Sequence, residues 1–118
     1  MIPYLFGDSR LIWRWRSDRE KTAAELTARS DIPDKKKTAL IGLFGKLELR
    51  YTRWRCYSTL DGSTQTAWYR VVAKDAESAV VVSYGNFGKS IYHVHFDDEY
   101  YWIILGRSNI REYFRRVP

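Results

Sequence analysis

The chain has 118 residues, enough for one domain with a single hydrophobic core, and it carries a net charge of +6. Its one cysteine, Cys56, excludes an intramolecular disulfide, and no apolar run approaches the roughly 20 residues of a membrane-spanning helix. The N-terminal residues do not resemble a secretory leader, so we expect a cytoplasmic protein unless a leader was removed earlier. Five Trp, nine Tyr and five Phe favour β-structure.

The N-terminal part predicts a lead-in and one short strand. Residues 1–9 are expected to be a poorly tied lead-in that ends in a turn. In the following segment, Leu11, Trp13 and Trp15 alternate with residues that are mostly basic. This alternation predicts a strand with one aromatic face and one basic face.

Two short helices are predicted in an insertion that spans residues 17–44. Ser17 is suited to cap the first helix, because Glu20 follows three residues later as in a capping box. An Asp-Ile-Pro sequence ends this helix, and Asp34 is suited to cap the second one.

From residue 46 to 118 the sequence predicts a β-meander, because strand-forming runs alternate with short turns that leave no room for crossover helices. The expected strands are Leu47–Ser58, Gln65–Lys74, Ala79–Tyr84, Ser90–Phe96, Tyr100–Leu105 and Arg111–Val117. The first run changes parity, which predicts a bulge or sharp bend near Thr52 and Arg53. Pairing the first strand with the last closes the sheet. We therefore predict a mainly β single domain over residues 1–118, a small antiparallel up-and-down barrel of about seven or eight strands.

These features resemble the lipocalin and fatty-acid-binding superfamily, the calycins, and in particular small bacterial lipocalin-like domains. The resemblance consists of a first-strand Trp, an up-and-down meander and a last strand rich in Arg and aromatic residues. It implies that Trp13 or Trp15 packs under Arg115 or Arg116 and closes one barrel end. It also implies a ligand inside the barrel.

Arginines interleave with aromatic residues on the second and third expected strands. For a ligand-binding barrel, Arg53, Arg55 and Arg70 are the candidates for holding an anionic head group. The candidates for the wall of the site are Tyr51, Tyr69 and Trp102. The same pattern also suits a stacking surface for single-stranded nucleic acid, or simple cross-strand pairing.

The sequence contains no convincing catalytic constellation. His93, His95 and Asp97 share a strand face and are weak candidates for metal ligands; we expect no cofactor. The carboxylates of residues 97–99 are interpreted as a charged turn, and Cys56 as a core residue. The predicted function is therefore non-enzymatic.

Three classes of partner remain open. The first choice is a small apolar or amphipathic ligand, with or without a negative charge, inside the barrel. The alternative is a filled barrel that acts as a structural or protein-interaction module. Two strand segments that are apolar on both faces, Val80–Val82 and Tyr100–Leu105, are candidates for a homodimer surface. A nucleic-acid partner ranks below both.

Overall fold

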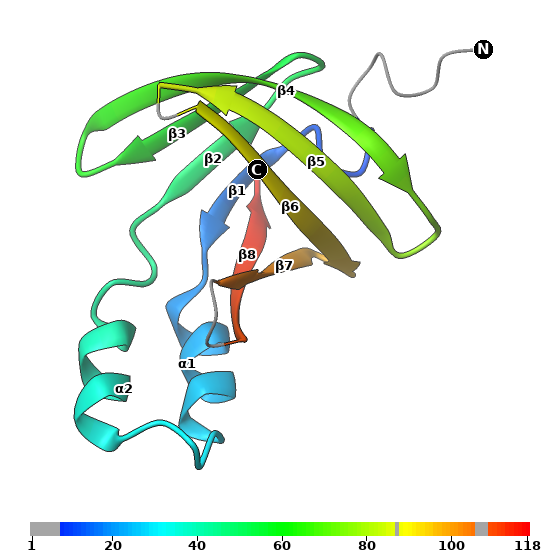
Figure 1. Ribbon diagram of the computed structural model, residues 1–118. Coiled ribbons are helices and arrows are strands. Elements are labelled where there is room, and N and C mark those ends of the chain that lie inside the picture. Colours follow the sequence, from blue (N-terminus) through cyan, green and yellow to red (C-terminus); the bar gives the residue numbers. More distant parts are fainter. Residues whose placement is uncertain (1–7, 87, 106–108) are drawn as a thin grey trace.

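The computed structural model describes residues 8–86, 88–105 and 109–118 and forms a closed barrel of eight antiparallel strands (Figure 1). Each strand pairs with the next along the chain, and the first pairs with the last. The strands are β1 (Arg14–Ser17), β2 (Glu48–Tyr51), β3 (Arg55–Leu60), β4 (Ser63–Lys74), β5 (Ser78–Gly85), β6 (Gly88–Asp97), β7 (Tyr100–Leu105) and β8 (Ile110–Val117). The predicted fold class is confirmed. Of the predicted lead-in, residues 1–7 lie outside the described residues.

The prediction of one bent strand over residues 47–58 is wrong, because this segment folds into a hairpin. Tyr51 on β2 pairs with Cys56 on β3 across a tight turn. The Thr52 N–H donates to the Arg55 carbonyl over 2.9 Å, and the Arg55 N–H donates to the Thr52 hydroxyl over 3.2 Å. A threonine thus supplies the turn contacts that Gly, Asn or Pro more often supply. The parity change in the sequence is the hairpin turn itself.

The predicted pair of helices follows β1, as α1 (Arg19–Thr27) and α2 (Asp34–Ile41), but both predicted caps are wrong by one residue. Asp18 caps α1, because its side chain accepts a hydrogen bond from the Lys21 N–H over 3.0 Å. Pro33 precedes α2 as its cap and offers no side-chain hydrogen bond, while Asp34 is already helical. Within the described residues, no helix has the length and apolar character needed to cross a bilayer.

Ser17 does not cap the helix because its side chain is used inside the protein. Its hydroxyl donates to the Glu112 carboxylate over 2.8 Å and accepts from the Gly45 N–H over 3.0 Å. Gly45 has a φ of +89°, and a Cβ there would come within 3.0 Å of the Arg19 Cβ. A glycine is therefore needed where the chain leaves α2 and returns to the barrel.

The two helices extend from one end of the barrel (Figure 1). They enclose a second, smaller core of Leu26, Ile32, Phe44 and Ile110. Hydrogen bonds join α1 to β8: the Tyr113 N–H donates to the Thr22 hydroxyl over 2.9 Å. The helices therefore pack against β8 and lie away from the wall formed by β3 to β6 (Figure 1).

Candidate functional site

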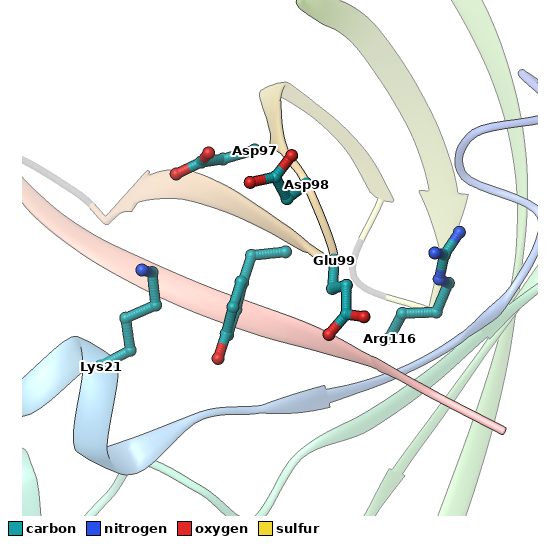
Figure 2. Close-up of a pocket in the computed structure, with 6 residues that line it drawn as sticks. Lys21, Asp97, Asp98, Glu99 and Arg116 are labelled. Atoms are coloured by element: carbon teal, nitrogen blue, oxygen red, sulfur yellow. The ribbon is translucent and has the colours of Figure 1, made fainter.

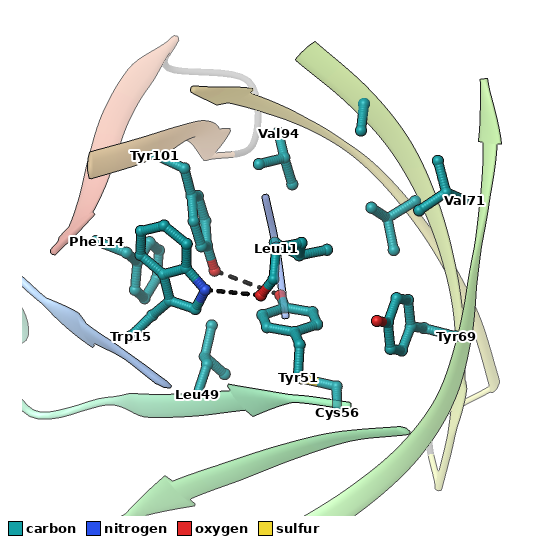
Figure 3. Close-up of a cluster of buried hydrophobic side chains, with 12 residues drawn as sticks. Leu11, Trp15, Leu49, Tyr51, Cys56, Tyr69, Val71, Val94, Tyr101 and Phe114 are labelled. Atoms are coloured by element: carbon teal, nitrogen blue, oxygen red, sulfur yellow. Dashed lines mark hydrogen bonds between the residues drawn. The ribbon is translucent and has the colours of Figure 1, made fainter. Parts of the chain in front are cut away.

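The interior of the barrel is filled with the protein's own side chains (Figure 3). The buried residues of this core are Leu11, Trp15, Leu49, Tyr51, Cys56, Tyr69, Val71, Ala79, Val81, Val94, Tyr101 and Phe114. Leu11, Val81 and Val94 are 0% exposed. The rings of Trp15 and Tyr101 meet edge to face at 4.7 Å, and Tyr101 stacks on Phe114 at 4.9 Å. This is the packing of a core, with aromatic rings where a ligand-binding barrel has its cavity.

Polar atoms inside the core are paired with one another. The Tyr51 hydroxyl lies 3.3 Å from the hydroxyls of both Tyr92 and Tyr101. Burial raises the pKa of Tyr51 and of Tyr101 well above the ordinary value, so both hydroxyls stay protonated. Burial likewise raises the pKa of the Cys56 thiol to about 11, which disfavours the thiolate that a nucleophile requires.

The chain segment before β1 enters the barrel and forms part of this core. Leu11 was predicted to lie on the first strand, but it belongs to a turn inside the barrel, where its carbonyl accepts from the Trp15 indole N–H over 2.9 Å. Strand β1 begins only at Arg14. We call this segment, residues 8–12, the plug. The alternation of apolar residues did not distinguish a plug from a continued strand, because both arrangements bury Leu11 and Trp15.

A half-buried arginine, Arg10, anchors this plug to the barrel. The Arg10 guanidinium contacts both oxygens of Asp8, at 3.0 Å for Oδ1 and 2.6 Å for Oδ2, and also donates to the carbonyls of Ala76 and Ser78 on the other side of the barrel end. Burial acts to raise the pKa of Asp8, but hydrogen bonds and the charge of Arg10 outweigh it and hold that pKa below the ordinary value. Arg10 also lies over the Phe96 ring at 4.4 Å.

The structure does not bring the predicted ligand-binding residues together. Tyr51 and Tyr69 are buried in the core, where they meet edge to face at 5.2 Å. Arg55 and Arg70 are exposed on the other side of the wall, and Arg53 is exposed in the turn between β2 and β3. The reason is strand alternation: neighbours such as Tyr69 and Arg70 point to opposite faces of the sheet.

Trp102, the sixth predicted residue, also lies on the outer side of the barrel. It stacks on His95 with ring centroids 3.9 Å apart, and the Arg111 guanidinium lies over it at 4.0 Å. The sequence-predicted head-group residues and wall residues therefore do not form one site inside the barrel.

The outer wall carries a surface that sequence reasoning found only in part. Cross-strand pairing aligns Arg55 on β3, Trp68 on β4, Tyr84 on β5 and Lys89 on β6 in one row. The next row contains Arg70, Val82 and Ile91. We call six of these residues the aromatic–basic face: Arg55, Trp68, Arg70, Tyr84, Lys89 and Ile91.

Large apolar side chains are exposed on this face. Trp68 is 55% exposed, Tyr84 42% and Ile91 64%. The Arg55 guanidinium lies 4.4 Å from the centroid of the Trp68 ring and supports one side of it. The contribution of Tyr84, Lys89 and Ile91 was missed, although their parity in the sequence places them on the same side as Trp68.

The histidines form part of a hydrogen-bonded and stacked arrangement. The His93 Nε2 atom lies 2.7 Å from the Ser78 hydroxyl, which donates to Asp75 over 3.0 Å; His93 Nε2 therefore supplies the proton of its own hydrogen bond. Burial, together with the charges of His93 and Arg111, lowers the pKa of His95. Within the described part of the chain, no group of three His, Cys, Asp or Glu is placed to hold a metal.

The residues proposed for barrel closure fall into three positions. Arg116 lies over the Trp13 ring, 4.5 Å from its centroid, at the end of the barrel. Trp15 is buried below, in the core, and Arg115 is exposed on the outer side. Arg116 on β8 thus contacts Trp13, which directly precedes β1.

Surface depressions lie at the turn regions. One, of about 630 Å³, is lined by Asp97, Asp98 and Glu99 together with Lys21, Tyr100 and Arg116 (Figure 2). Another, of about 680 Å³, lies beside the start of α1 among Arg16, Arg19, Lys46 and Arg115. Both are wide and carry charges of both signs, which suits solvated surface more than an enclosed acid–base pair.

No family model, no curated protein and no solved structure matches this chain.

Proposed function

We propose that this chain is a non-enzymatic binding module whose barrel is filled by its own core and whose anionic partner binds on the aromatic–basic face. The observation that carries the filled barrel is the position of Leu11, 0% exposed in the core, and the outer partner is inferred from the exposed Trp68, Tyr84 and Ile91 beside cations. A ligand in that space would have to expel the plug and break the hydrogen bonds from Arg10 to the carbonyls of Ala76 and Ser78. We also propose that the calycin resemblance extends to the barrel and its Trp13–Arg116 contact, without the interior ligand.

The space left at the other end of the barrel is small. There the inward positions carry short polar side chains, among them Ser58, Ser83 and Ser90, around a depression of about 110 Å³. Ligand pockets for small organic molecules are usually about 300–1,000 Å³. This depression therefore gives little support to a lipid or other amphipathic ligand.

The strand segments considered for a homodimer are partly covered within one copy. Val82 is 5% exposed, although it lies on the outer side of the sheet. In the β7 segment, Lys21 lies over the Tyr100 ring at 4.5 Å, and Trp102 is stacked between neighbours. The larger exposed apolar area lies on the aromatic–basic face, where cations surround it.

Native mass spectrometry of protein purified without denaturation tests the filled barrel. We expect the bare mass of the chain. A co-purified adduct of lipid mass would overturn the proposal, and a dimer mass would replace the anionic partner with a second copy of the chain.

Retention on an immobilised polyanion tests the face. We expect the double variant Arg70→Gln and Lys89→Gln to elute at lower salt than the double variant Arg14→Gln and Arg115→Gln. The control removes the same number of exposed charges from the opposite side of the barrel. Equal elution of the two variants would mean that net charge alone causes retention.

A further inference from the structure

We infer that the aromatic–basic face binds single-stranded nucleic acid, with bases stacked on Trp68 and Tyr84 and phosphates bound by Arg55, Arg70 and Lys89. This inference rests on the proposed function and names its partner. The side chains come from four paired strands of a closed barrel, so the wall holds their spacing before any ligand arrives. A rigid platform of this kind lowers the entropy cost of binding.

The charge of the surface selects an anion. Residues 55–60, 63–72, 80–84 and 88–95, which form this part of the wall, contain three Lys or Arg and no Asp or Glu. The net charge of these segments is therefore +3, half of the net charge of +6 of the whole chain. The acidic residues Asp61, Asp75 and Asp97 lie at turns and strand ends outside these segments. A polyanion can therefore follow the wall without meeting a carboxylate.

The geometry of the row suits a short single strand. Arg55, Trp68, Tyr84 and Lys89 occupy four adjacent strands, and three steps of about 4.8 Å place its ends about 14 Å apart. At 3.4 Å per nucleotide, the spacing along one strand of duplex DNA, that distance spans about four nucleotides, the upper limit for a more extended single strand. Two neighbouring aromatic residues with a cation on either side would contact bases in the middle and phosphates at both ends. Duplex DNA stacks its base faces internally and cannot use the two rings in this way.

An anionic membrane fits the same residues less well. Insertion would bury the exposed aromatic rings among lipid chains, but Arg55 lies over the Trp68 ring at 4.4 Å and would be drawn in with it. Moving a guanidinium into the hydrocarbon region is costly. A planar base, in contrast, can stack on the exposed side of an indole whose other side carries a guanidinium.

Fluorescence anisotropy with labelled oligothymidylate and oligouridylate of about 12 nucleotides tests the inference. We expect both single strands to bind more tightly than a duplex of the same length, and any difference between them reports on the 2′-hydroxyl. Three phosphate contacts predict a slope of about −2.1 in log K against log salt, so raising salt from about 50 to about 200 mM weakens binding about 18-fold.

The Trp68→Ala and Tyr84→Ala variants test stacking. Each is expected to weaken binding of the single strands by about 5- to 150-fold, the range for loss of one base–aromatic stack. Trp13→Ala is the matched control, because Trp13 is also exposed (47%) and also carries an arginine on its ring, but lies at the β1–β8 side. Trp68 is half exposed, so its variant should retain the wild-type circular dichroism spectrum.

Three results would overturn the inference. Equal binding of single strand and duplex, unchanged in the Trp68 and Tyr84 variants, would reduce the interaction to general attraction of polyanions. Binding of phosphatidylserine vesicles that depends on Trp68, without oligonucleotide binding, would replace the partner and leave the proposed function standing. Absence of oligonucleotide binding at low salt would also exclude nucleic acid as the partner. Failure of the proposed function would be detected in a different experiment, as a lipid-mass adduct in native mass spectrometry.

Discussion

Replacing Leu11 with alanine measures how far the plug belongs to the core. Leu11 is 0% exposed, and the variant removes three buried carbon atoms. At about 0.8 kcal/mol for each buried carbon, their transfer to water costs about 2.4 kcal/mol. The cavity left behind adds to this, so Leu→Ala changes in a rigid core cost about 2.7–5.0 kcal/mol. We expect a loss of about 3 kcal/mol.

The corresponding change in thermal unfolding can be calculated from the chain length. An unfolding entropy of about 2.1 cal/mol/K for each of 118 residues gives about 0.25 kcal/mol/K, so the midpoint should fall by about 12 °C. Circular dichroism during heating and urea titration measures both quantities. Leu43→Ala is the matched control, because Leu43 is 71% exposed and its variant should change the free energy of unfolding by less than about 0.5 kcal/mol. A loss below about 1 kcal/mol for the Leu11 variant would mean that the plug is not part of the core, and the filled-barrel proposal would fall with it.

Three further predictions concern buried polar groups. Burial raises the pKa of Glu112, and the hydrogen bond from Ser17 offsets this rise only in part. The contribution of Glu112 to the free energy of unfolding is therefore fully present below the unfolded-state pKa, near 4.5, and is lost as pH rises through the folded-state pKa. Glu112→Gln should unfold at a higher temperature than wild type at pH about 7, with the difference disappearing towards pH about 4; a constant difference would contradict this. Tyr51→Phe leaves the Tyr101 hydroxyl without this partner in the core and should cost about 1–3 kcal/mol in urea titration, whereas a neutral result would show that the hydroxyls find other partners. The Cys56 thiol, with a pKa of about 11, should react with a disulfide reagent at pH about 8 only when urea unfolds the protein; rapid reaction of the folded protein would contradict its burial.

Most of the barrel could be predicted from the sequence, because strand alternation and turn residues are local signals. The β2–β3 hairpin was missed because Thr52 makes its turn without Gly or Pro. The helix cap was assigned to Ser17 because local spacing could not reveal the distant carboxylate of Glu112, 95 residues away, that Ser17 binds instead. Local rules identify which residues can cap a helix, but tertiary contacts decide which one does.

The candidate site was harder to predict, for two physical reasons. Arg70 and Tyr69 are adjacent in one strand, so they could not both line an interior site, and alternation alone contained that information. The plug, by contrast, left no signal: whether Leu11 continues a strand or turns into the barrel depends on Arg10, which is paired with Asp8, reaching the carbonyls of Ala76 and Ser78. Contacts across more than 60 positions are not visible in a local pattern.

The pairing of β1 with β8 has a consequence for the order of folding. Trp15 reaches its final surroundings only when Phe114 and the rest of β8 are present, about a hundred positions later in the chain. A nascent chain that has been synthesised only as far as β7 keeps two unpaired sheet edges, on β1 and on β7. Closure must therefore wait until the C-terminal strand has left the ribosome, and it involves contacts of high sequence separation, which form slowly. During that interval the open edges are exposed to pairing with other chains, so this is the stage at which the chain is most open to aggregation.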